Sequence, residues 1–231
     1  MNLNSNSYVL GFATCVCVVV STALALTANS LKEAQQKAAE FDRQKNVMIA
    51  AGLCGADDAR SQAELEQLYK DRVVEVVIDT DSGEVVDKKS EEVDGKRFRK
   101  IATTKDGKGN LEALVLPISG RGLWSTLYGF LALDADKNHV RGITFYKHGE
   151  TPGLGGEVEN PQWQAQWKGK TVFDADGKLA SIKVKKGKVD PGIPAEKAHS
   201  VDGLSGATIT SNGVTNFVAA DLRKFESYLK K

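Results

Sequence analysis

Residues 113–118 read ALVLPI, residues 127–134 read LYGFLALD, and residues 140–148 read VRGITFYKH. Each run is short and apolar, and β-branched or aromatic residues recur in it, which favours β-strands. The residues DADKNH at 134–139 join the last two runs and are typical of a hairpin turn. We therefore expect these runs to form neighbouring strands of a mainly antiparallel sheet.

Weaker patterns on both sides extend this arrangement. Helices are expected at about 61–72 and, with an amphipathic pattern, from about Ser211 to Leu229. The stretch 87–110 is polar and rich in lysine, and we expect a surface loop or an irregular hairpin there. Further strands are expected at 73–79, 84–88 and 179–187. The sum predicts an α+β fold with a twisted, mainly antiparallel sheet and packed helices.

The bulk composition excludes several classes of protein. Among 231 residues, 31 are Lys or Arg and 30 are Asp or Glu, so the net charge is +1, and no nucleic-acid partner is expected. Cys15 and Cys17 lie two positions apart, where helical side chains do not face each other. Cys54 stands alone and is expected to be a small buried residue. The cysteines predict neither a disulfide framework nor a metal site.

The N-terminal segment predicts a membrane anchor in contact with lipid. Residues 8–28 contain no charged side chain, and 21 helical residues span about 31 Å, the thickness of a hydrocarbon core. A cleaved signal peptide is disfavoured because residues 1–7 contain no basic residue. A helix is expected at 30–52, either capped at Ser30 or continuous with the anchor.

The charges that follow the apolar segment bear on its orientation. Lys32, Lys37, Arg43 and Lys45 come after it, and no basic residue precedes it. By the positive-inside rule, this bias predicts a cytoplasmic domain.

Three segments carry candidate chemistry, and each has two interpretations from its residues alone. Residues 202–211, DGLSGATITS, are either a Ser/Thr-rich helix cap or a place where a phosphate meets small residues and a helix N-terminus. Residues 147–157, KHGETPGLGGE, are either a plain turn or a ligand loop. In GRGLWSTLYG, at 120–129, Trp124 either fills the core or stacks on a flat ring.

Taken together, these segments resemble a known family. The run DGLSGAT resembles the flavinylation motif in which FMN is joined to the final threonine by a phosphoester bond, and ETPGLG resembles the second hallmark of the same FMN-binding domain family. The run GRGLWSTLYGFLALD is similar to the C-subunit family of the bacterial Na⁺-translocating NADH:quinone oxidoreductases. The resemblance covers nearly the whole chain, including the anchor.

The resemblance implies a covalent FMN with Thr208 as its attachment point, and Thr210 and Ser211 are the nearby alternatives. It also implies roles for ten further residues, and it implies no metal ligand and no residue that is catalytic by itself. Asp202 would assist the modifying flavin transferase. The residues that would contact the phosphate, the ribityl chain or the isoalloxazine, or flank its pocket, are Ser205, Gly206, Ala207, Glu150, Thr151, Leu154, Gly155, Trp124 and Ser125.

The implied organisation has three parts. Residues 1–28 would be the anchor, residues 29–110 membrane-proximal helices and an irregular α+β region, and residues 111–231 the core of a single FMN-binding domain. The chain would relay electrons inside a six-subunit inner-membrane complex that oxidises NADH, reduces ubiquinone and exports sodium. The resemblance places the domain in the periplasm, where the flavin transferase acts, against the cytoplasmic placement predicted by the Lys and Arg bias.

Two alternatives remain open from the sequence. The first is the corresponding flavin protein of the related ferredoxin-linked electron-transport complex, in which a different glycine-rich stretch stands at the position of Gly120 to Trp124. The second is a membrane-tethered scaffold domain without a cofactor. Co-purifying proteins would distinguish the first, and a colourless protein would support the second.

Overall fold

The structure, a computed structural model, describes residues 6–87 and 96–231. The chain divides into two compact units, Met1–Asp42 and Arg43–Lys231. Among the described residues, the second unit contains a larger and a smaller sheet and the helices that follow α1 (Asn6–Ala50). Strands on both sides of residue 110 belong to its larger sheet, so the fold is α+β, as the sequence predicts. The division at residues 28 and 110 stays a prediction.

Helix α1 runs without a break over Asn6–Ala50. The expected helix at 30–52 is therefore continuous with the apolar segment, and Ser30 is not an N-cap. The Ser30 hydroxyl donates instead to the carbonyl of Thr27 at 2.8 Å, inside the helix. Within the described residues, α1 is the one helix long and apolar enough to cross a membrane.

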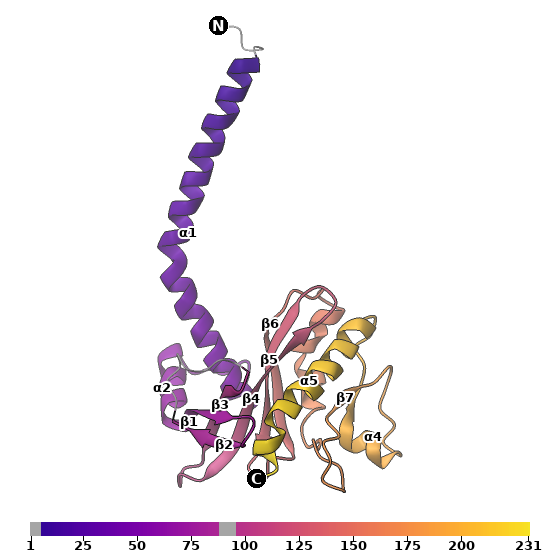
Figure 1. Cartoon of the computed structure of the whole chain (residues 1–231). Coiled ribbons are helices and arrows are strands. Elements are labelled where there is room, and N and C mark those ends of the chain that lie inside the picture. The colour runs from indigo at the N-terminus through magenta and orange to yellow at the C-terminus, as the bar shows by residue number, and fades with distance from the viewer. Residues whose placement is uncertain (1–5, 88–95) are drawn as a thin grey trace. The chain divides into compact units, whose positions relative to one another are not determined.

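The larger sheet of the second unit is antiparallel throughout, with strand order β2-β1-β3-β4-β5-β6 (Figure 1). Its strands are β1 (Val73–Asp79), β2 (Glu84–Val86), β3 (Phe98–Lys105), β4 (Leu111–Arg121), β5 (Thr126–Asp134) and β6 (Val140–Lys147). The three apolar runs of the sequence form β4, β5 and β6, as predicted.

Strand β3 corrects the expectation for the polar stretch 87–110. Residues 98–105 pair with β1 on one side and with β4 on the other, so they form an inner strand of the sheet. Ile101 and Ala102 are buried, whereas neighbouring lysines and arginines keep the average polarity of the segment high. Residues 88–95 lie outside the described residues.

The remaining elements are short except for the last helix. Helix α2 begins with the capping box of Ser61 and Glu64, and the strand expected at 179–187 is reduced to two residues. These elements are α2 (Gln62–Arg72), the 3₁₀ helix η2 (Gly155–Glu159), α3 (Pro161–Ala165), β7 (Lys183–Val184), α4 (Pro194–His199), β8 (Ser200–Val201) and α5 (Thr208–Leu229).

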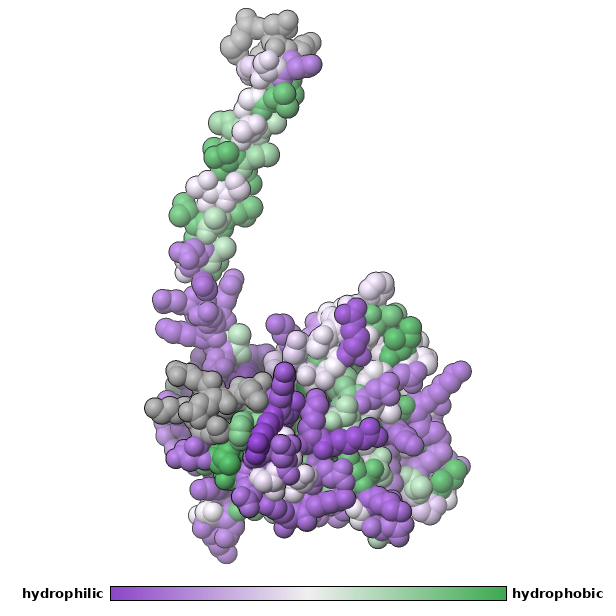
Figure 2. Space-filling model, viewed as in Figure 1, coloured by the Kyte–Doolittle hydropathy of each residue, from purple (hydrophilic) through white to green (hydrophobic). Residues whose placement is uncertain are grey.

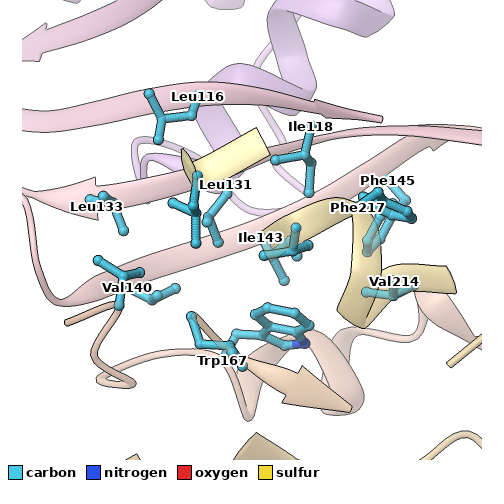
Figure 3. Packing of buried hydrophobic residues seen from close by; sticks show 14 of the residues in the cluster. Leu116, Ile118, Leu131, Leu133, Val140, Ile143, Phe145, Trp167, Val214 and Phe217 are labelled. Atoms are coloured by element: carbon cyan, nitrogen blue, oxygen red, sulfur yellow. The ribbon is translucent and has the colours of Figure 1, made fainter. Parts of the chain in front are cut away.

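The hydrophobic core lies between the larger sheet and α5. Figure 3 shows side chains from β4, β5 and β6 meeting side chains of α5 and the indole of Trp167. Its labelled members are Leu116, Ile118, Leu131, Leu133, Val140, Ile143, Phe145, Trp167, Val214 and Phe217. The buried Asp221 of α5 also accepts a hydrogen bond from the backbone N–H of Ser119 at 2.8 Å. These contacts fix α5 against β4 and thereby set the position of its first turn.

Candidate functional site

The first turn of α5 begins earlier than the sequence indicates. The helix starts at Thr208, three residues before the expected start at Ser211, and its N-cap Ala207 makes no side-chain capping bond. The Ser211 N–H already donates to the Ala207 carbonyl at 2.9 Å, and the Ser211 hydroxyl accepts from the Leu204 N–H at 3.3 Å. Ser211 is therefore a buried member of the first turn and not its cap.

The hydroxyl groups of this turn face different surroundings. The side chain of Thr208 is exposed, whereas Thr210 is 1% exposed and Ser211 is 4% exposed. Ser205, just before the helix, is exposed as well. Of the three hydroxyl-bearing residues inside the first turn, Thr208 alone presents its side chain to solvent.

A small cleft beside Thr208 is bordered by a lysine-containing loop. Lys185, Lys186 and Gly187 line it together with Thr208. The carboxylate of Asp202 accepts from the Val189 N–H at 2.8 Å, which holds this loop. Asp202 is half-buried. The hydrogen bond between its carboxylate and the Val189 N–H could not be predicted from the sequence.

The motif residues next to Thr208 pack against the loop at residues 147–157, which we call the glycine-rich loop. Gly206 has φ +69°, a value that favours glycine, and a Cβ there would lie 2.7 Å from the Leu154 side chain. Ser205 and Gly206 are exposed and Ala207 is buried. Two segments that are far apart in the sequence, at Leu154 and Gly206, therefore meet in space.

Glu150 joins the three predicted segments. Its carboxylate accepts hydrogen bonds from the backbone N–H groups of Leu123, Trp124 and Ser125 at 2.9–3.1 Å and from the Thr210 hydroxyl at 2.6 Å. Burial raises the pKa of this carboxyl, but these hydrogen bonds outweigh burial, and the pKa lies below its ordinary value. Glu150 is therefore an ionised, buried group at the centre of the site.

A further hydrogen bond joins the loop between β4 and β5 to the glycine-rich loop. The Ser125 hydroxyl oxygen accepts from the Gly149 N–H at 2.6 Å. The indole of Trp124 lies outside the core and is 65% exposed, so the core-filling interpretation of this residue is wrong. Thr151 is also exposed, and its carbonyl accepts from the N–H groups of Leu154 and Gly156.

Exposed apolar side chains surround this junction. We call Leu123, Trp124, Leu154 and Ile209 the apolar rim; their exposed fractions run from 42% to 65%. Figure 2 shows hydrophobic atoms on the end of the domain where α5 begins. Leu123 and Ile209 were missed by sequence reasoning, although each is the immediate neighbour of a predicted site residue.

The three predicted segments therefore meet in one region of the structure. Hydrogen bonds of Glu150 and Ser125 join the loop before β5 to the glycine-rich loop. Leu154 and Gly155 join the glycine-rich loop to the first turn of α5, since a Cβ on Gly155 would lie 2.7 Å from the Thr210 hydroxyl. Asp202 contributes differently, because its carboxylate binds the backbone of the lysine-containing loop.

The chemistry of this region suits an anionic, flat ligand. An exposed hydroxyl lies at a helix N-terminus beside lysines, and the apolar rim lies next to it. Lys186 and Thr210 complete the site. Lys186 does not stand out in the sequence, because it lies in a lysine-rich strand pattern, and Thr210 was expected only as an alternative attachment residue. In the described part of the chain, no group of three His, Cys, Asp or Glu side chains could hold a metal ion.

Comparison with known proteins identifies an FMN-binding domain that includes the same region. The family model for the FMN-binding domain matches residues 122–223, which include the loop at Trp124, the glycine-rich loop and the first turn of α5. Crystal structures of the C subunit of the Na⁺-translocating NADH-quinone reductase from Parabacteroides distasonis and of NqrC from Shewanella oneidensis have TM-scores of 0.70 and 0.69. The first is 27% identical and covers 86% of this chain and 97% of its own, and the second is 29% identical and covers 82% and 96%.

Two sequence relatives are likewise named as the C subunit of a Na⁺-translocating NADH-quinone reductase. The protein from Pseudomonas aeruginosa is 40% identical over 99% of this chain and 96% of its own length. The protein from Yersinia pestis is 39% identical over 87% of this chain and 82% of its own. The chain therefore belongs to the C-subunit family of the Na⁺-translocating NADH-quinone reductases, and it contains that family's FMN-binding domain.

Proposed function

We propose that this chain carries one FMN, joined by a phosphoester bond to the Thr208 hydroxyl, and relays electrons within a Na⁺-translocating NADH:ubiquinone oxidoreductase. The observation that carries the proposal is the exposed side chain of Thr208 in the first turn of α5, inside the FMN-binding match. The buried hydroxyls of Thr210 and Ser211 make them poor substitutes, because a modifying enzyme must reach the oxygen that it modifies.

The surroundings of Thr208 suit a phosphoester. The diester would keep one negative charge, which the free N–H groups at the start of a 22-residue helix favour. Lys186 lines the same cleft and adds a positive charge. Ser205, Gly206 and Ala207 are small, so they leave room for the phosphate and the ribityl chain beside the backbone.

The apolar rim suits the flavin ring. Trp124 and Leu154 are exposed apolar side chains near the attachment point, and burying them against a flat ring is favourable. When bound, FMN supplies the electron-transfer chemistry, and the protein holds it and sets its potential. The residues of this chain act by positioning and by charge, so the isolated chain is not a catalyst.

Attachment requires a group transfer by a partner enzyme. A flavin dinucleotide is a suitable donor, because its pyrophosphate already contains a leaving group. The bond between the Thr208 oxygen and phosphorus forms, a pyrophosphate P–O bond breaks, a nucleoside monophosphate leaves, and the hydroxyl proton passes to a base of the transferase. The chain gains the mass of FMN less one water.

The proposed setting is the inner membrane. The apolar part of α1 would lie in lipid, the domain would lie in the periplasm with the flavin transferase, and the chain would be one of six subunits. The relatives of the chain are named as subunits of a Na⁺-translocating NADH-quinone reductase, and this favours the sodium-translocating complex over the ferredoxin-linked complex. The FMN-binding match likewise disfavours a scaffold without a cofactor.

The intact mass of the full-length chain tests the proposal. Co-expressed with a flavin transferase, the wild-type chain should gain one FMN less one water, and Thr208→Ala should lose both this increment and the fluorescent band on a denaturing gel. Thr208→Ser, which keeps a hydroxyl, is the matched control and should retain at least part of the increment. A modified Thr208→Ala chain, or a modified peptide in which another residue carries the mass, would contradict the assignment of Thr208.

A further inference from the structure

Glu150 combines deep burial with an uncompensated charge. The residue is 5% exposed, and no Lys, Arg or His forms an ion pair with it in the described ranges 6–87 and 96–231. Three consecutive backbone N–H groups and one hydroxyl solvate the carboxylate instead. A buried charge held only by neutral hydrogen-bond donors acts on its neighbours more strongly than a neutralised ion pair does.

The backbone makes room for this carboxylate from two sides. A Cβ on Gly122 would lie 2.7 Å from one carboxylate oxygen, and a Cβ on Gly155 would lie 2.7 Å from the other. Both distances are shorter than van der Waals contact, so a side chain at either position would displace Glu150. The loop before β5 and the glycine-rich loop are thus fitted around one acidic group.

The hydrogen bond from Thr210 connects this group to the attachment point. Successive residues of an α-helix are rotated by about 100°, so residues two apart point to nearly opposite sides. Because Glu150 holds the Thr210 hydroxyl inward at 2.6 Å, Thr208 faces solvent. One carboxylate therefore fixes both the direction of the Thr208 side chain and the position of the loop at Trp124.

We propose that Glu150 is a positioning residue that presents the Thr208 hydroxyl for modification and whose negative charge lowers the reduction potential of the attached flavin. The inference rests on the proposed function and deepens it. A fixed anion opposes the addition of an electron nearby, so removing the anion makes reduction easier. A residue that served packing alone would change stability and leave the potential unchanged.

The test uses the full-length chain in detergent with three variants. Glu150→Gln keeps the shape and removes the charge, and Thr210→Val removes the hydroxyl and keeps the charge. Asp221→Asn is the matched control, because Asp221 is a buried carboxylate that also ties α5 to β4, about 20 Å further along the helix than Thr208. The measurements are the rate of FMN attachment by the transferase, the midpoint potential of the modified chain, and the melting temperature.

Glu150→Gln should slow attachment about tenfold or more, which is the fold-change expected when charge-assisted hydrogen bonds that orient the turn are weakened. It should also shift the midpoint potential upward. Thr210→Val should slow attachment with a smaller shift of the potential, and Asp221→Asn should lower the melting temperature with the potential unchanged.

The inference is overturned if Glu150→Gln is modified at the wild-type rate and has the wild-type potential. If Glu150→Gln does not fold, Thr210→Val decides, because wild-type attachment kinetics in that variant exclude the positioning role. A wild-type chain that gains no FMN mass overturns the proposed function itself, and the inference with it. The two failures are therefore distinguishable.

Discussion

At the residue scale, Glu75 on β1 shows how charge holds the end of α1 to the sheet. Its carboxylate accepts hydrogen bonds from the Arg43 guanidinium at 2.7 Å and from the Tyr69 hydroxyl at 3.0 Å, and the Lys100 ammonium lies 3.0 Å away. Burial raises the pKa of Glu75, but these partners outweigh burial and lower the pKa to about 2. The residue therefore contributes to stability only while it is ionised.

The pH dependence of this contribution has a definite sign. A carboxyl whose pKa is lower in the folded state stabilises the fold above its unfolded value of 4.5, and loses this effect as the pH falls to about 2. Glu75→Gln should lower the free energy of unfolding at neutral pH by up to about 3 kcal/mol. The difference from wild type should shrink between these two pH values in urea titrations followed by circular dichroism.

The control for Glu75 is Glu84→Gln on the neighbouring strand β2. The Glu84 side chain is 68% exposed, and the ammonium of its ion-pair partner Lys231 lies 3.4 Å away. This variant should stay within about 0.5 kcal/mol of wild type at every pH. A Glu75→Gln difference that is constant from neutral to acid pH would show that the effect arises from packing and not from ionisation.

Residue identity alone indicated which segments to examine, but it did not indicate how they contact one another. The motif specifies Thr208 and its neighbouring glycines, and their role in holding FMN stays a prediction. The contacts of Glu150 could not be predicted, because three of its partners are backbone N–H groups, which any residue other than proline supplies in the β4–β5 loop. The exposure of Trp124 was not evident either, since burial depends on what α5 and the loops cover.

At the element scale, the packing of α5 on β4 depends on close backbone approach. A Cβ on Gly213 would lie 2.3 Å from the carbonyl oxygen of Arg121, a backbone atom that cannot turn away. The strands β4 to β6 were predictable because their apolar runs are strong. The polar strand β3 was not, because its pairing with two neighbours overrides its composition.

Gly213→Ala separates helix propensity from packing. Propensity alone would stabilise the helix by up to about 1 kcal/mol, because alanine is the better helix former. The steric conflict with the Arg121 carbonyl should outweigh this gain and lower the free energy of unfolding by about 1–3 kcal/mol, which would be seen as a lower melting temperature. Gly107→Ala is the control, since a Cβ there meets no atom within 4 Å. A higher melting temperature in Gly213→Ala would contradict the close approach.

At the scale of the whole molecule, the apolar part of α1 does not by itself determine on which side of a membrane the domain lies. The Lys and Arg bias after residue 28 favours the cytoplasm, whereas a periplasmic flavin transferase requires a periplasmic domain. Alkaline phosphatase, which is active only after export, should be active when fused after Lys231. A cytoplasmic reporter such as β-galactosidase at the same position should be inactive, and the reverse pattern would place the domain in the cytoplasm.

The contacts of the site join residues that are far apart in the sequence, and this separation determines when the site can form during synthesis. Glu150 and Thr210 are 60 residues apart, and Ser119 and Asp221 are 102 residues apart, so both contacts need the C-terminal helix. Contacts of such long sequence separation form late in folding. Helix α5 must therefore leave the ribosome before the Thr208 hydroxyl has this environment, so the flavin attachment proposed above would act on the folded domain and not on the growing chain.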